Sequence, residues 1–150
     1  VYSKNLKTGE EKTIVDESEN FVWTADPHMS WGQYVVYQID RSVYVYDMET
    51  QTSKKLFTHD PDWDFYNYMI LDGHVIVIGG TEDTCRAWAD DIAEGSVIGL
   101  DTLGGNVMPF SAHYECNGYF VGLLHASNNA DKYYISKEDY YRSNYDAAFR

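Results

Sequence analysis

The stretch SVYVYDMETQTSKKL, residues 42–56, has the pattern of a strand, a turn and a second strand. Alternating Val and Tyr suit a strand that buries one face, and the polar, Thr-rich segment after Asp47 suits a tight turn. Long helical periodicity is almost absent from the rest of the chain, so the sequence predicts an all-β protein. Whether these residues form one isolated hairpin or one element of a repeat decides which all-β fold is expected.

The pattern recurs along the chain. Residues 1–14, VYSKNLKTGEEKTI, align without a gap with residues 43–56. Residues 97–110, VIGLDTLGGNVMPF, fit the same frame, and a weaker copy begins at Lys132. Each copy is expected to form a strand, a turn and a second strand.

A second hairpin pattern lies between these copies and places a glycine turn before an apolar strand. It occurs at Gly32, Gly73 and Gly118. Two alternating hairpins give four strands per unit at a period of about 40–50 residues, which is typical of β-propeller blades. The predicted fold class is therefore all-β, with blades of four antiparallel strands in an incomplete propeller, and the alternative is a β-sandwich.

The repeat predicts a single propeller segment over residues 1–150. It consists of a half blade at 1–15 and blades at about 27–57, 66–110 and 113–142. A propeller closes on itself so that no sheet edge stays exposed, and the half blade lacks two inner strands. We therefore expect a segment of a larger propeller, with the remainder of that propeller chain as a partner. The alternative is a small irregular ring.

The blade pattern resembles the TolB-like family and the propeller domains of dipeptidyl-peptidase-type enzymes. In those blades the third strand commonly reads I-Y-x-x-D-L followed by T-G; VYVYDMETQT matches it here, and NLKTGEEKTI matches with Asn5 in the place of the Asp. The first strands differ, because SWGQ, LDGH and CNGY stand where TolB-like blades have S-P-D-G. The resemblance implies a propeller that binds proteins or gates a separate hydrolase domain.

Charge and hydropathy narrow the classes of partner. The formal net charge of −13 repels phosphate backbones and anionic membrane surfaces. The chain has no run of 18 apolar residues that could form a transmembrane helix. We therefore expect no nucleic-acid partner and no membrane insertion, and we keep proteins and carbohydrates as partners. The working expectation for location is extracytoplasmic or secreted.

The candidate ligand site lies on loops that the blade topology places on one face. These are the blade-joining loops 16–28 and 58–65 and a long loop at 79–95, with a short helix around 86–94. Tryptophan rings stack on sugars or on cationic side chains, and carboxylates hydrogen-bond to either. The predicted ligand-binding residues are Trp23, Trp63, Trp88, Asp62, Asp64, Arg86, Asp90 and Asp91. The alternative is that the tryptophans pack the loops down and the acids are solvated.

Motifs for catalysis and metal binding are weak. The sequence has no G-x-S-x-G elbow, no P-loop and no zinc-ligand spacing. Asp60, Asp62 and Asp64 have the alternate spacing of a calcium loop, but Phe65 and Leu71 stand where Gly and a bidentate Glu are needed. Calcium is therefore a minor alternative, and we predict no other cofactor.

Cys85 and Cys116 are expected to be free thiols, because the blade map places them on opposite faces. The leading functional prediction is a non-catalytic binding module that presents an acidic, Trp-containing loop face to a protein or glycan. One alternative is the propeller portion of a larger hydrolase or lyase, with catalytic groups in the central channel. The other is a structural repeat that assembles through its open edges.

Overall fold

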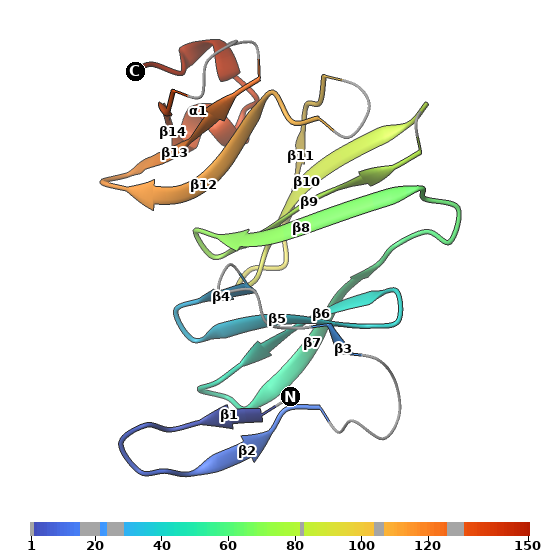
Figure 1. Cartoon of the computed structure of the whole chain (residues 1–150), viewed down its shortest axis with the longest axis vertical. Helices are drawn as coiled ribbons and strands as arrows, with labels where there is room; N and C mark the ends of the chain where they lie inside the picture. The colour runs from blue at the N-terminus through green and yellow to red at the C-terminus, as the bar shows by residue number, and fades with distance from the viewer. Residues whose placement is uncertain (1, 16–21, 24–28, 82, 104–106, 126–130) are drawn as a thin grey trace. The chain divides into compact units, whose positions relative to one another are not determined.

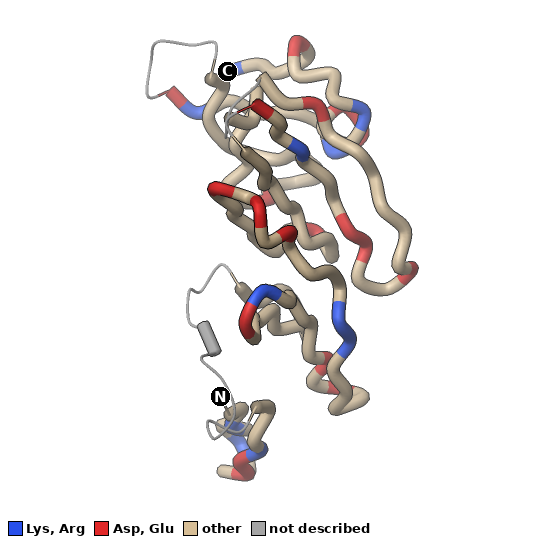
Figure 2. The backbone as a smooth tube through the Cα atoms, turned by 90° about the vertical axis from the view of Figure 1, so that its right-hand side faces the viewer, with Lys and Arg blue, Asp and Glu red and all other residues tan. Residues whose placement is uncertain are grey.

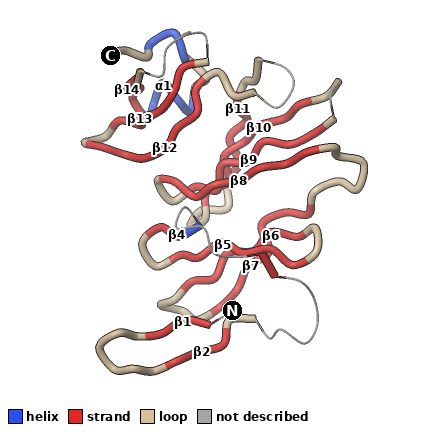
Figure 3. Tube along the Cα trace, in the orientation of Figure 1, coloured by secondary structure: helices blue, strands red, loops and turns tan. Residues whose placement is uncertain are grey.

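The computed structural model describes residues 2–15, 29–81, 83–103, 107–125 and 131–150, together with the backbone of residues 22–23. Over these residues the protein is all-β, with four antiparallel sheets and no closed barrel (Figure 1). Helix is confined to short segments (Figure 3). The chain divides into two compact units, unit 1 at Val1–His59 and unit 2 at Asp60–Arg150.

Unit 1 contains a two-stranded and a five-stranded sheet. The strand order of the larger sheet is β3-β5-β6-β7, and β4 also pairs with β5. The prediction of a strand, a turn and a strand for residues 42–56 is confirmed by β6 and β7, and that for residues 1–14 by β1 and β2. The strands are β1 (Tyr2–Lys4), β2 (Glu11–Thr13), β3 (Val22–Trp23), β4 (Ser30–Trp31), β5 (Tyr34–Ile39), β6 (Ser42–Asp47) and β7 (Thr52–Thr58).

Unit 2 contains two more sheets and two short helices. One sheet has the order β11-β10-β9-β8 and the other β12-β13-β14. Its strands are β8 (Phe65–Leu71), β9 (His74–Gly80), β10 (Cys85–Asp91), β11 (Val97–Leu100), β12 (Phe110–Cys116), β13 (Tyr119–Leu124) and β14 (Tyr133–Ser136). They are followed by α1 (Lys137–Tyr141) and the 3-10 helix η2 (Tyr145–Ala147).

The hairpin turns of the repeat share one hydrogen-bonding pattern. Oδ1 of Asp47 accepts bonds from the backbone N–H groups two and three residues onward, at 2.8 and 3.3 Å. Oδ1 of Asn5 accepts the corresponding bonds at 2.9 and 3.2 Å, and Oδ1 of Asp91 accepts one at 2.7 Å from three residues onward. Such side-chain bonds stabilise a turn locally. The repeat seen in the sequence is therefore a repeat of turn chemistry.

The structure corrects the expected loop at residues 79–95. Cys85–Asp91 forms strand β10, which pairs with β9 along its whole length, so the prediction of a helix around residues 86–94 is wrong. Residues 97–110 are not a hairpin either. They contain β11 and then the first residue of β12, which belongs to the next sheet.

The third copy of the repeat is instead found at residues 87–100. This segment, AWADDIAEGSVIGL, aligns without a gap with residues 43–56 and places Asp91 in the position of Asp47. Small Ala residues replace two Val residues of the opening stretch, and Ala has a low strand propensity. The strand forms nonetheless, because its alanines pack in the core of unit 2.

The last sheet also differs from the predicted four-stranded blade. The segment from Lys132 begins as β14 but continues as α1, whose N-terminus is capped when the Ser136 hydroxyl accepts the Asp139 N–H at 3.0 Å. The outer edge of β14 is instead paired with the C-terminal segment. There the backbone groups of Tyr134 and Phe149 exchange hydrogen bonds of 2.7 and 2.9 Å.

A hydrophobic core joins the two sheets of unit 2. Phe110, Phe120 and Ile135 from the last sheet are 0% exposed and cluster with Ile76 and Ala89 from the first. Burying one large apolar side chain contributes about 1.5–3 kcal/mol. Two antiparallel sheets packed in this way fit an incomplete propeller or a sandwich.

Gly122 on β13 pairs with Ala112 of β12 and leaves no room for a side chain. A Cβ atom there would stand 2.0 Å from the carbonyl oxygen of Ser111, whereas a Cβ at Gly99 would meet nothing within 4 Å. We expect Gly122→Ala to lower the free energy of unfolding by about 2–3 kcal/mol, as overpacking does. The matched Gly99→Ala change should stay within about 0.5 kcal/mol. Urea denaturation measures both, and equal effects would contradict the packing described.

The fifth residue of the repeated turn has a left-handed backbone. Gly9 and Gly95 have φ values of 73° and 72°, and the equivalent Gln51 has a φ of 58°. A non-glycine residue there costs about 1–2 kcal/mol. We therefore expect Gln51→Gly to raise the free energy of unfolding by about 1 kcal/mol, measured by urea denaturation. Gln51→Ala, which also removes the contact with Lys12 Nζ, should give no gain.

Candidate functional site

Two of the three predicted tryptophans meet in unit 2. Trp63, in the segment before β8, and Trp88, on β10, have ring centroids 5.9 Å apart in an edge-to-face arrangement of 61°. Gly79 on β9 makes room for this pair, because a Cβ there would lie 2.6 Å from Cζ3 of Trp63. Trp88 is therefore a strand residue, not the loop residue that the sequence analysis expected.

The strand register places further aromatic side chains beside this pair. Tyr66 lies opposite Gly79 across β8 and β9, and Tyr68 lies opposite Val77, which is also the partner of Trp88. The Tyr66 and Tyr68 rings are stacked at 6.5 Å, and Tyr66 is 39% exposed. We call Trp63, Tyr66, Tyr68 and Trp88 the aromatic face of the first sheet in unit 2.

The aromatic face lies opposite the core of unit 2. Side chains alternate along β10, so Ala87 and Ala89 join the core while Arg86 and Trp88 project from the other side. Arg86 is exposed at the end of this face. Burial and the neighbouring Tyr66 raise the pKa of Tyr68 to about 12, which keeps its hydroxyl neutral.

The predicted acidic residues do not form one cluster: two lie in the segment before β8, and two lie on opposite sides of β10. Asp62 and Asp64 are exposed and flank Trp63 in the segment before β8. Asp90 is 7% exposed and lies on the same side of β10 as Trp88. Asp91 lies on the opposite side, where its Oδ2 is 3.5 Å from Nε2 of His74, so it does not belong to the aromatic face. Acidic residues are distributed along the described backbone of the protein (Figure 2).

The segment around Asp60 is a hydrogen-bonded turn. Oδ1 of Asp60 accepts the Asp62 N–H at 3.0 Å, its carbonyl accepts the Trp63 N–H at 3.2 Å, and the Asp64 N–H donates to Gly80 at 2.9 Å. Among the described residues, His, Cys, Asp and Glu form no group of three or more that could hold a metal ion. The calcium prediction for Asp60, Asp62 and Asp64 therefore gains no support.

The third predicted tryptophan, Trp23, belongs to unit 1. Its backbone pairs with Gln38 in the contact between β3 and β5, and its side chain lies outside the described residues. Most of the predicted loop 16–28 lies outside them as well. Cys85 and Cys116 are both free thiols in the structure.

The structure also reveals a polar cluster that the sequence analysis missed. Nζ of Lys137, on α1, forms ion pairs with Asp72 in the β8–β9 turn and with Glu115 on β12, the latter at 2.8 Å. Partial burial lowers the pKa of Lys137, but hydrogen bonds with these two carboxylates outweigh it and raise that pKa. The ammonium group therefore links the two sheets of unit 2 through the helix.

One helical turn later, Tyr141 extends this cluster. Its hydroxyl lies 3.1 Å from Nδ1 of His74 and donates to Oδ2 of Asp72 at 3.4 Å. The ring centroids of Tyr141 and His74 are 4.6 Å apart. Burial, and then the nearby Asp72 carboxylate, raise the pKa of Tyr141 strongly. Lys137 and Tyr141 are four residues apart, a spacing that would have indicated the cluster if the helix had been predicted.

No model of a known protein family matches the sequence, and no curated protein matches it either. The resemblance to TolB-like propellers therefore stays a prediction. In the part of the chain that the structure describes, none of the helices has the length and apolar character needed to cross a membrane.

The Tyr141 hydroxyl makes stability depend on pH in the alkaline range. Because its pKa is raised on folding, its contribution is fully present below the unfolded tyrosine pKa of about 10 and is lost as pH rises toward the folded pKa. We expect Tyr141→Phe to cost about 0.5–1.5 kcal/mol at neutral pH and to flatten the loss of stability above pH 10, measured by urea denaturation. Tyr2→Phe, at a residue 68% exposed, is the control. It should change neither the free energy of unfolding at neutral pH nor the loss of stability above pH 10. An unchanged alkaline slope in Tyr141→Phe would contradict this assignment.

Proposed function

We propose that the protein is a non-catalytic binding module that holds a protein or glycan partner on the aromatic face of unit 2. The observation that carries the proposal is the contact between the Trp63 and Trp88 rings. Gly79 leaves the room that the Trp63 ring occupies. Tryptophans bring large contact area with little conformational freedom to lose, which is why they recur at binding sites.

The polar groups around this pair suit a ligand with hydroxyl or cationic groups. Asp62 and Asp64 are exposed on either side of Trp63, and their carboxylates accept hydrogen bonds from sugar hydroxyls or from Lys and Arg side chains. Arg86 adds donors at the same end of the sheet, across from Gly79. The aromatic rings would stack on a sugar or on a cationic side chain.

Catalysis is left out of the proposal because of the contacts around Lys137. Asp72 and Glu115 both form ion pairs with Lys137, and the Tyr141 hydroxyl donates to Asp72. Such contacts support a role in fixing the helix to the sheets. We extend the proposal to the architecture by treating the two sheets of unit 2 as propeller blades, and the remainder of a larger propeller chain as a further partner.

The proposal is tested by presenting the full chain to a glycan array and to an array of Lys- and Arg-containing peptides. We expect retention on one of them, and quenching of tryptophan fluorescence when the retained compound is titrated in solution. Trp63→Ala should weaken binding roughly tenfold or more, as loss of a central aromatic anchor does. Trp31→Ala removes a tryptophan that is 40% exposed in unit 1 and should leave the affinity unchanged.

Two results would overturn the proposal. One is the absence of retention on both arrays at the highest concentrations used. The other is binding that Trp63→Ala and Trp31→Ala weaken equally, which would place the ligand elsewhere. Circular dichroism of each variant shows whether a loss of binding accompanies a loss of strand structure, and Gly79→Ala gives a second way to displace the Trp63 ring.

A further inference from the structure

Two hairpins of unit 2 turn through an Asp-Gly or an Asn-Gly pair. The β8–β9 turn contains Asp72 and Gly73, and the β12–β13 turn contains Asn117 and Gly118. No other Asp-Gly or Asn-Gly pair occurs in the sequence. In chain order the φ values of these residues are 54°, 71°, 51° and 84°. Such pairs are typical of two-residue hairpin turns, in which both positions have a left-handed backbone.

An Asn-Gly pair is chemically reactive as well as suited to a turn. Asparagine is among the thermolabile residues. The backbone nitrogen of the residue that follows it, once deprotonated, attacks the carbon of the side-chain amide. Glycine hinders this attack least, because it has no Cβ and takes up φ values of either sign. Asn117 and Gly118 are therefore the residue types that this reaction needs, in the order that it needs them.

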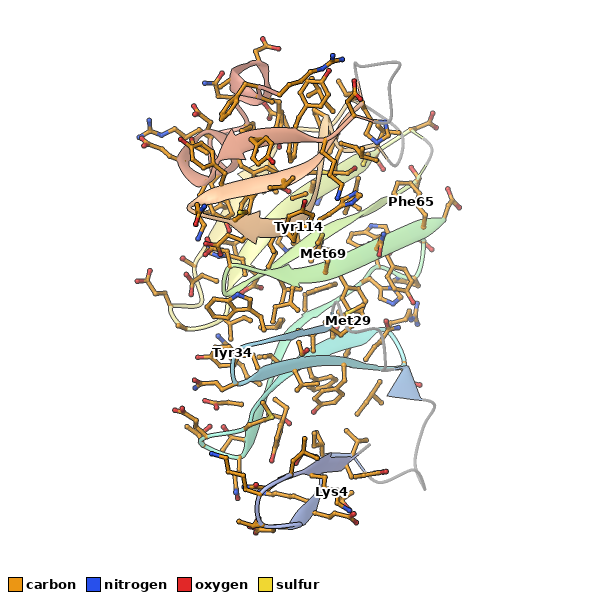
Figure 4. All side chains as sticks on the ribbon, turned by 60° about the vertical axis from the view of Figure 1, so that its left-hand side comes forward. Lys4, Met29, Tyr34, Phe65, Met69 and Tyr114 are labelled. Atoms are coloured by element: carbon orange, nitrogen blue, oxygen red, sulfur yellow. The ribbon has the colours of Figure 1, made fainter. Side chains whose placement is uncertain are left out.

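The turn at Asn117 and Gly118 also has room for the reaction. Both residues are exposed, and a Cβ atom at Gly118 would meet nothing within 4 Å. Figure 4 shows Tyr114 on β12, the strand that leads into the turn, and Cys116 pairs with Tyr119 across the hairpin. The turn beyond this pair can therefore rotate and bring the Gly118 nitrogen to Cγ of Asn117 without displacing a packed side chain.

The equivalent turn at Asp72 and Gly73 is held by its neighbours. The Asp72 carboxylate forms an ion pair with Lys137 and accepts a hydrogen bond from the Tyr141 hydroxyl at 3.4 Å. The Gly73 carbonyl accepts the Ile92 N–H at 3.0 Å. The Asp72 side chain must leave Lys137 and Tyr141 before it can reach the Gly73 nitrogen. Of two turns with the same backbone shape, the structure therefore fixes the first and leaves the second able to rearrange.

We propose that Asn117 is a site of spontaneous modification, at which asparagine converts to aspartate and isoaspartate through a succinimide ring. The Gly118 nitrogen loses its proton to hydroxide and forms a bond to Cγ of Asn117. The Cγ–Nδ2 bond breaks, and the side-chain nitrogen takes up a proton and leaves as ammonia. Water then opens the ring at either carbonyl carbon. Opening at Cγ gives aspartate, and opening at the backbone carbonyl carbon gives isoaspartate. The sum is uptake of one water and release of one ammonia, with no oxidant or reductant.

The isoaspartate product alters the hairpin. Its main chain passes through the side-chain methylene, so the turn gains an additional backbone atom. Turn length and turn type set the register of a hairpin. Strand β13 carries Phe120, which is 0% exposed in the core of unit 2, so a disturbed register reaches that core. The aspartate product keeps the ordinary backbone and adds only a negative charge. Neither product depends on the binding function proposed for the aromatic face.

The first test incubates the full chain at neutral and at mildly alkaline pH and follows each Asn by peptide mapping and mass spectrometry. A protein isoaspartyl methyltransferase is the probe for isoaspartate. We expect conversion at Asn117 with a rate that rises with pH, since the attacking nitrogen must lose its proton. Gly118→Ala should slow this conversion severalfold. The internal control is Asn67, which is also exposed but lies in β8 and precedes Tyr68. The absence of conversion at Asn117, or equal rates at Asn117 and Asn67, would overturn the proposal.

The second test separates the two products by their effect on the hairpin. The isoaspartate-containing fraction of the incubated protein is isolated by ion exchange and compared with the Asn117→Asp variant, which carries the same charge on an ordinary backbone. We expect the isoaspartate fraction to unfold at a lower urea concentration than Asn117→Asp, and we expect Asn117→Asp to unfold close to the unmodified protein. Equal midpoints for the two would show that the turn does not set the register, and this part of the proposal would be wrong.

Discussion

The hydrogen bond that an Asn or Asp side-chain oxygen accepts from a backbone N–H two or three residues onward is the interaction on which the rest of this structure depends. Asn5, Asp47 and Asp91 each occur at a turn between paired strands and accept backbone N–H groups onward in the chain. A turn sets the register of its hairpin, and a slip of one residue would move every side chain to the other face. These turns therefore decide which residues become core and which become surface.

The consequence is clearest in unit 2, where side-chain alternation separates the residues of the core from those on the opposite side of each sheet. On β10 the alternation directs Ala87 and Ala89 into the core and Trp88 to the aromatic face. In the last sheet the same alternation directs Phe120 inward and Tyr119 outward. The core is shared by both sheets, so each surface rests on a rigid layer. For the binding function proposed above, side chains ordered before a partner arrives would lower the cost of binding.

The candidate site shows how far sequence patterns reach. Trp63 and Trp88 were both predicted as ligand-binding residues, but the reason for their contact is Gly79, which is separate from both in the chain. Asp91 was assigned to the same site and instead serves a turn and faces His74, because β10 is a strand and alternate residues point to opposite sides. The Lys137 cluster was not predicted at all, since its members come from a turn, a strand and a helix that were not placed together.

By itself, the sequence determined the all-β class, the hairpins over residues 1–14 and 42–56, and the strongly negative net charge. These follow from local properties, namely side-chain alternation, turn residues and charge, and each is readable over a few positions. Only the tertiary structure decided that residues 85–91 form a strand and residues 137–141 a helix. Small alanines have weak strand propensity, and the strand forms because Ala87 and Ala89 are buried in the core of unit 2 together with Phe110 and Ile76. Packing outweighs propensity there, since burial against partners distant in the chain contributes more free energy than any local preference of the backbone.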